Sequence, residues 1–197
     1  MKKLLMLAIV VAVVGSLMGG STVMAAGKHG QAGKSNVAFL YLYEKDPSTW
    51  EIVDSGAWGK LKYNLAGPTF DFVFNGHGLQ PNINYSLIYY ADFPNRMVNW
   101  GGNNPGALIA TGTTNPGGQL HLAGSPNLNM DLPHPDDANN TIDYSGAPDY
   151  YAHAHGAKIW LVPSSDYNAG MKKVTAWNPT QYLFETDLIT YDDTDVP

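Results

Sequence analysis

Two histidines in the last quarter of the chain have the spacing of a metal-binding pair. His153 and His155 are separated by one alanine, and side chains at positions i and i+2 of an extended segment point to the same side. Imidazole nitrogens bind Zn²⁺ and Cu²⁺ well. The pair could therefore hold one such ion, with either His134, Asp136 and Asp137 or His121 completing the ligand set. The alternative is two solvated loop histidines, which the frequency of chance patterns favours.

An acidic segment offers a second kind of metal site. Between Arg96 and Lys158 the chain has no lysine or arginine, so neither competes for the carboxylates there. Ca²⁺ takes about six to eight oxygen ligands from carboxylates, amides and backbone carbonyls. A solvated acidic loop is the equally weighted alternative. The oxygen-bearing residues of the expected calcium site are Asp131, Asp136, Asp137 and Asp143, with Asn139 or Asn140.

Aromatic residues in loop-like stretches suggest a third chemistry, the stacking of flat rings on sugars. Trp100 stands in a stretch rich in glycine and asparagine, and binding residues tend to lie on loops held by a rigid scaffold. Simple loop packing is the alternative for this residue. Trp50, Trp58 and Trp160 have strand-like neighbours, so we expect them in the core. The other candidate stacking residues are Tyr144, Tyr150 and Tyr151.

The residue content argues against catalysis and against nucleic-acid binding. The chain has no cysteine, three glutamates and no Gly-x-Ser-x-Gly sequence, so no catalytic constellation is recognisable and we expect a non-enzymatic protein. Removal of Lys2 and Lys3 with an N-terminal signal would leave 9 basic and 17 acidic residues, a formal charge of −8. Nucleic acids and anionic lipids both need a basic face, so neither is an expected partner.

The first 25 residues have the pattern of a secretory signal peptide. Two lysines precede an apolar run from Leu4 to Val14, and small residues follow up to Ala25. The run is well short of the roughly 20 residues that span a bilayer. We expect a signal peptide over residues 1–25, a flexible segment over 26–35 and a single domain over 36–197. The mature protein would be extracellular or in the cell envelope, with no membrane span.

Stretches of alternating apolar and polar residues predict about eight β-strands. They lie at residues 36–43, 60–65, 70–74, 85–90, 107–111, 119–122, 158–163 and within 181–191, and short strands separated by turn residues indicate an all-β antiparallel sandwich. The stretches 107–111 and 119–122 flank a turn and are expected to form a hairpin. Residues 124–156 are expected to form one long irregular loop, and residues 192–195 a frayed tail.

The most specific local pattern precedes the stretch 85–90. Leu79, Pro81 and Tyr85 have the spacing Leu-x-Pro-x-x-x-Tyr. This resembles the tyrosine corner of fibronectin type III and other immunoglobulin-like modules over about twenty residues. The resemblance implies a Greek-key sandwich in which the hydroxyl of Tyr85 returns to the backbone a few residues upstream. Residues 58–61 and 156–162 are similar to uncharacterised secreted prokaryotic proteins, which implies an envelope or extracellular setting.

Together these patterns favour a secreted, non-enzymatic binding or structural module at the cell surface or in the extracellular matrix. Its expected partner is a protein or a glycan, and its expected site is the loop face of residues 131–155, organised by Ca²⁺. The first alternative is a carbohydrate-binding module that uses the loop aromatics. The second is Zn²⁺ or Cu²⁺ binding through His153 and His155.

Overall fold

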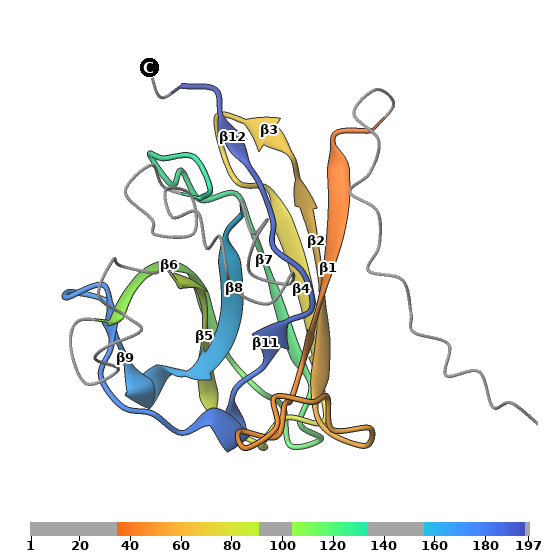
Figure 1. The fold of residues 1–197 in the computed structure, drawn as a ribbon. Coiled ribbons are helices and arrows are strands. Elements are labelled where there is room, and N and C mark those ends of the chain that lie inside the picture. The colour runs from red at the N-terminus through yellow and green to blue at the C-terminus, as the bar shows by residue number, and fades with distance from the viewer. Residues whose placement is uncertain (1–34, 91–103, 134–155, 196–197) are drawn as a thin grey trace, which may run out of the picture.

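In the described part of the chain, two five-stranded β-sheets pack face to face and a two-stranded sheet adjoins them (Figure 1). The computed structural model describes residues 35–90, 104–133 and 156–195. In these ranges there is no α-helix, and apart from one short parallel pair the strands run antiparallel. The predicted fold class, an all-β antiparallel sandwich, is confirmed. The expected signal peptide and the segment 26–34 lie outside the described residues.

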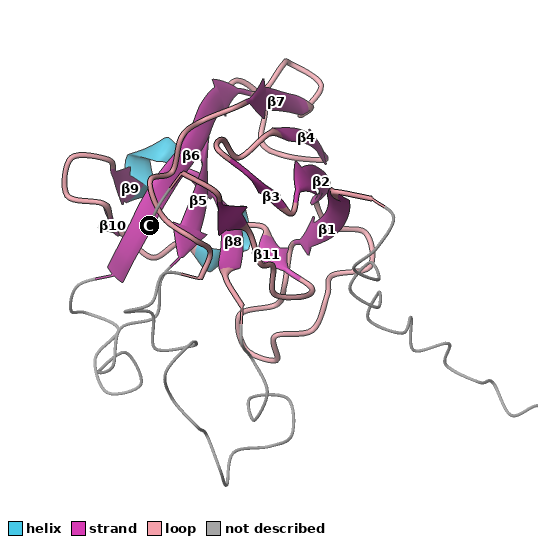
Figure 2. Cartoon of the chain, turned by 90° about the horizontal axis from the view of Figure 1, so that it is seen from above, coloured by secondary structure: helices cyan, strands magenta, loops and turns pink. Residues whose placement is uncertain are grey.

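Each of the two packed sheets has five strands, and Figure 2 shows the two layers from above. The first sheet has the order β11 (Phe184–Glu185), β1 (Val37–Tyr43), β2 (Trp58–Asn64), β4 (Phe72–His77) and β7 (Leu120–Gly124). The second has the order β8 (Lys158–Pro163), β5 (Asn84–Tyr90), β6 (Asn104–Thr113), β10 (Lys173–Val174) and β9 (Tyr167–Asn168). Two 3₁₀ turns, η1 (Ser164–Asp166) and η2 (Pro179–Gln181), interrupt the C-terminal part.

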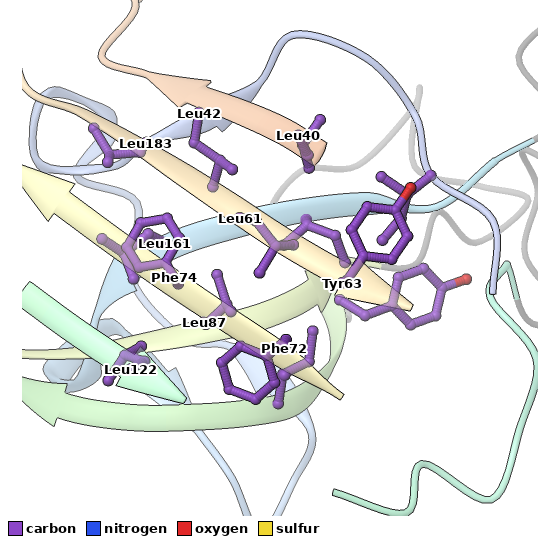
Figure 3. Packing of buried hydrophobic residues seen from close by; sticks show 14 of the residues in the cluster. Leu40, Leu42, Leu61, Tyr63, Phe72, Phe74, Leu87, Leu122, Leu161 and Leu183 are labelled. Atoms are coloured by element: carbon purple, nitrogen blue, oxygen red, sulfur yellow. The ribbon is translucent and has the colours of Figure 1, made fainter. Parts of the chain in front are cut away.

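The main core lies between the sheets because one face of each strand is apolar. Leu61 and Phe74 of the first sheet are fully buried opposite Leu87 and Leu161 of the second (Figure 3). In β2 the buried positions alternate with part-exposed or exposed ones, as the period-2 pattern of the sequence predicts. This alternation leaves the other face of the first sheet directed away from the core.

A second apolar cluster covers the outer face of the second sheet. Tyr90 stacks on Trp160 with ring centroids 3.8 Å apart, and the segment from η1 to β11 closes over them. Buried Asp166 holds this segment: its Oδ2 accepts hydrogen bonds from the Tyr182 hydroxyl at 2.8 Å and the Asn178 amide at 2.9 Å. Strand β5 is therefore buried on both faces, whereas the first sheet has no such cover among the described residues.

The corner before β5 carries the chain from the first sheet to the second. Tyr85 is buried, and the Gln80 backbone hydrogen-bonds to its hydroxyl, which partly offsets the rise in its pKa caused by burial. The Thr114 hydroxyl donates to the Gln80 carbonyl at 2.6 Å and accepts the Ile83 N–H at 3.0 Å. The corner is thus fastened to the turn that follows β6.

Two local predictions are wrong. The segments around residues 107–111 and 119–122 do not pair as a hairpin, because β6 pairs with β5 and β10 whereas β7 pairs with β4 in the other sheet. The turn between them is present, closed by a hydrogen bond from Gly118 N–H to the Asn115 carbonyl at 2.9 Å. Residues 192–195 are not a frayed tail: β12 (Asp192–Asp193) pairs in parallel with β3 (Ala66–Gly67), and Asp193 is buried.

Candidate functional site

The structure describes two of the residues predicted for the metal sites, Asp131 and His121; His121 lies in β7, where its Nδ1 forms a hydrogen bond of 2.8 Å with Asn75 Oδ1. Asp131 lies beside β12, where its Oδ1 accepts the Asp193 N–H at 2.8 Å. Within the described ranges, no three histidine, aspartate or glutamate side chains form a group that could hold a metal ion. The calcium and transition-metal sites therefore stay predictions. Their other residues lie outside the described residues: His134, Asp136, Asp137, Asp143, His153 and His155.

Around Asp131 the acidic residues have a structural role. Buried Asp193 Oδ2 accepts the Met130 N–H at 3.2 Å. The neighbouring carboxyl of Asp195 has a raised pKa, because it is hydrogen-bonded to Asp193 and close to that carboxylate's charge. These contacts, with a hydrogen bond from the Asn127 amide to Asp195 Oδ2 at 3.3 Å, fix the C-terminal strand to residues 127–131.

The predicted sugar-stacking residues Trp100, Tyr144, Tyr150 and Tyr151 also lie outside the described residues. Of the three tryptophans predicted to be in the core, only Trp160 is buried, with 3 % of its surface exposed. The prediction is wrong for Trp50 and Trp58, which expose 46 % and 38 %. In the described part of the chain, the exposed aromatic residues therefore include two that the sequence predicted to be in the core.

Much of the exposed aromatic surface lies on the outer face of the first sheet, which we call the sheet face. It consists of the side chains that alternate with the buried positions of β1, β2, β4 and β7. Figure 2 shows these strands on the far side of the core from the second sheet. Phe39, Tyr41 and Tyr43 alternate along β1 with buried Leu40 and Leu42. Phe39 exposes 56 % of its surface and Tyr41 38 %.

Strand register extends this line of rings into two rows across the sheet. In one row, Tyr43 pairs with Trp58 and Trp58 with His77; the last two rings lie 4.6 Å apart between centroids, tilted by 30°. The other row begins with the Tyr41 ring and continues with three polar side chains, those of Lys60, Asn75 and His121. Aromatic rings and hydrogen-bonding groups thus stand side by side on one sheet.

The polar groups of the sheet face are held in place. His121 Nδ1 and Asn75 Oδ1 form a hydrogen bond of 2.8 Å across β7 and β4. The Lys60 ammonium lies 4.4 Å from the ring centroid of Phe39 and 5.3 Å from that of Tyr41, a geometry in which the ring quadrupole attracts the cation. Tyr41 and Tyr43 are stacked with centroids 6.3 Å apart. The surface is therefore largely preorganised for a ligand.

A shallow, open depression of about 820 Å³ adjoins the sheet face at its β3 end. Lys62, Asn64 and Val73 belong to both. Asp71 also lines the depression, and hydrogen bonds from Ser125 and Thr69 lower the pKa of its carboxyl. This end of the surface combines apolar contact with donors and acceptors.

Two further exposed tryptophans lie near the other end of β1. Trp50 and Trp177 come from distant parts of the chain, and their rings lie 6.3 Å apart between centroids. Both pack against buried Phe184, at 5.2 and 6.2 Å, the register partner of Tyr43. Trp50 has a φ of 62°, a left-handed conformation that is strained for a bulky residue and often occurs at functional positions.

Next to Phe184, the part-buried Glu185 has one carboxyl oxygen, Oε2, that is shielded from solvent. Burial raises the pKa of its carboxyl, against the opposing effect of Lys158, Lys45 and the Trp160 indole. Trp160 Nε1 and Glu185 Oε2 are both buried, and neither has a hydrogen-bond partner of good geometry within the described part of the chain. Lys45 Nζ donates instead to the Glu185 backbone carbonyl at 2.9 Å.

The sheet face has the features that carbohydrate recognition requires. Flat exposed rings can cover the apolar face of a sugar ring, and the adjacent amide, imidazole and ammonium groups can bond to its hydroxyls. The structure shows no helix in the described ranges that is long and apolar enough to cross a membrane.

Comparison of the chain with protein families, curated proteins and solved structures gives no match. Membership of an immunoglobulin-like family therefore stays a prediction.

A sequence signal for the sheet face does exist. Residues 39, 41 and 43 are all aromatic while 40 and 42 are leucine, so one face of β1 is aromatic and the other aliphatic. Both faces of this strand carry apolar side chains, so the sequence alone does not distinguish the buried leucines from the exposed aromatic rings. Only the pairing with Lys60 and Lys62 of β2 shows which face meets solvent.

Proposed function

We propose that this protein is a secreted, non-enzymatic carbohydrate-binding module whose ligand lies across the sheet face. The observation that carries the proposal is the line of aromatic side chains on β1, continued across the sheet by Trp58 and His77 and flanked by Asn75, His121 and the lysines of β2. Extracellular location follows from the N-terminal sequence pattern.

The alternative explanation, incidental exposure of apolar residues, accounts poorly for this arrangement. Single exposed apolar residues are common on protein surfaces, but contiguous groups of large rings usually mark interaction sites. Here neighbouring rings share one face of a sheet and lie beside polar groups that have their own hydrogen bonds or cation–π contacts. A protein interface would favour a drier centre with fewer charged groups.

Sedimentation of the mature chain, residues 26–197, with insoluble polysaccharides tests the proposal. The panel would contain cellulose, chitin, xylan and an insoluble acidic polymer. We expect the protein to sediment with at least one of them. A Tyr41→Ala/Trp58→Ala variant should bind at least about tenfold more weakly, because two stacking surfaces are lost.

Leu108→Ala serves as the matched control, because Leu108 is an exposed apolar residue on the opposite sheet, with 37 % of its surface accessible. This variant should bind like the wild type. Circular dichroism would verify that all variants fold. Failure of the wild type to bind any polymer, or unchanged binding by the double variant, would refute the proposed function.

A further inference from the structure

The charge of the sheet face differs in sign from the charge of the chain. The full sequence has 17 acidic against 11 basic residues. The outward positions of β1, β2, β4 and β7 nevertheless contain Lys60 and Lys62 and no carboxylate. Positive charge concentrated on one surface attracts anions and raises their concentration there, even when the protein as a whole is acidic.

Among residues 35–90, 104–133 and 156–195, no carboxylate forms an ion pair with either lysine. In the described part of the chain, Lys60 contacts the rings of Phe39 and Tyr41 rather than a carboxylate. Lys62 is exposed one row further along β2, at the rim of the depression. The two side chains project from the same face of one strand, so both ammonium groups can contact one ligand. Asp71 is the acidic residue among the described residues that line the depression, and it accepts hydrogen bonds from Ser125 and Thr69.

We infer that the ligand of the sheet face is an anionic polysaccharide, bound through its uronate or sulfate groups by Lys60 and Lys62 and through its sugar rings by the aromatic side chains. This inference rests on the proposed function and specifies its ligand class. Lysine binds carboxylate and sulfate alike as a point charge. The rings select a sugar polymer over other polyanions, because they need a flat apolar surface to stack on.

Affinity electrophoresis of the mature chain, with three polymers cast in the gel, tests the inference. Polygalacturonate supplies carboxylates, its fully methyl-esterified form supplies the same backbone without charge, and a carrageenan supplies sulfates. We expect retardation by polygalacturonate or carrageenan that weakens with added salt, and none by the ester. Which acidic polymer retards the protein more strongly distinguishes the uronate from the sulfate source.

Lysine variants identify the groups that act. Lys60→Gln/Lys62→Gln should weaken binding to the acidic polymer at least about tenfold, since hydrogen bonds to charged groups contribute that much or more. Lys172→Gln is the control, because this exposed lysine lies in the turn before β10. It should leave binding unchanged.

Several results would overturn the inference. Equal retardation by the acid and the ester, or unchanged binding by the lysine double variant, would show that charge is not recognised. Sedimentation with neutral polymers alone would preserve the proposed function and refute this step, whereas binding to no polymer would refute both. A dimer in size-exclusion chromatography that Tyr41→Ala/Trp58→Ala dissociates would instead assign the sheet face to a second copy of the chain.

Discussion

Tyr85 shows how one side chain can hold a crossing between two sheets. Its ring is buried below the corner, and its hydroxyl contacts the Gln80 backbone. Tyr85→Phe keeps the ring and removes the hydroxyl, so the free energy of unfolding should fall by about 0.5–1.5 kcal/mol. Equilibrium denaturation with urea measures this difference. No loss, or a gain, would show that the hydroxyl does not stabilise the corner.

Glu185 should make stability depend on pH. Its pKa in the folded protein is raised above the ordinary 4.5 by burial. The native state therefore holds the proton more tightly than the unfolded chain, and this contribution is complete below the ordinary pKa and lost as pH rises through the raised one. Glu185→Gln removes the titration but keeps the backbone carbonyl that accepts from Lys45.

The stability of Glu185→Gln relative to wild type should accordingly increase between pH 4 and pH 7. Urea denaturation of both proteins at the two pH values measures the change. A difference that is constant with pH, or that shifts in favour of the wild type at pH 7, would contradict a raised pKa at this position.

Single residues were the hardest feature to predict from the sequence. Burial of Phe70, Phe72 and Phe74 follows from their alternation, and all three are buried. Trp50 and Trp58 look the same as core residues in sequence, yet they are exposed. Exposure depends on which face of a strand is covered by a distant segment, and no local pattern contains that information.

At the scale of elements, the turn between β6 and β7 depends on one glycine. Gly118 has a φ of 71°, and an added Cβ would collide with the backbone carbonyl of Leu79. Gly118 also accepts the Leu79 N–H at 3.0 Å, which ties this turn to the tyrosine corner. Only glycine satisfies both the conformation and the close approach.

Gly118→Ala should therefore lower the free energy of unfolding by about 2–4 kcal/mol, from the left-handed conformation and the backbone clash together. Gly117→Ala is the matched control next to it, since its added Cβ would meet only the Asn115 side chain, at 3.3 Å. That variant should lose less than about 1 kcal/mol. Similar losses for both variants, measured by urea denaturation, would contradict the account of this turn.

Strand positions were predictable, and strand pairing was not. The stretch at residues 36–43 was predicted to within one residue of β1, and that at 158–163 coincides with β8, because period 2 is a local property of the sequence. The pairing of β7 with β4, and of β12 with β3, joins residues far apart in the chain. The two-residue strands β9 and β10 are too short to produce a periodic signal.

At the scale of the whole molecule, the two sheets have different outer faces. The segment from η1 to β11 covers the second sheet with its own apolar cluster. The first sheet presents rings, lysines and hydrogen-bonding groups instead. The sequence patterns predicted a β-sandwich, which the structure confirms, and a binding site on loops that lie mostly outside the described residues. The exposed face of the first sheet could not be predicted, because its exposure depends on which distant segments pack against each side of the sheet.

The most direct test of the sheet face as the binding site is an NMR titration of the isotopically labelled mature chain with soluble oligosaccharide fragments of the polymer it binds. We predict chemical-shift changes concentrated on Tyr41, Trp58, Lys60 and His121, with the signals of the second sheet unaffected. Changes confined to Trp50 and Trp177, to the second sheet or to loop residues such as Trp100 would contradict the account.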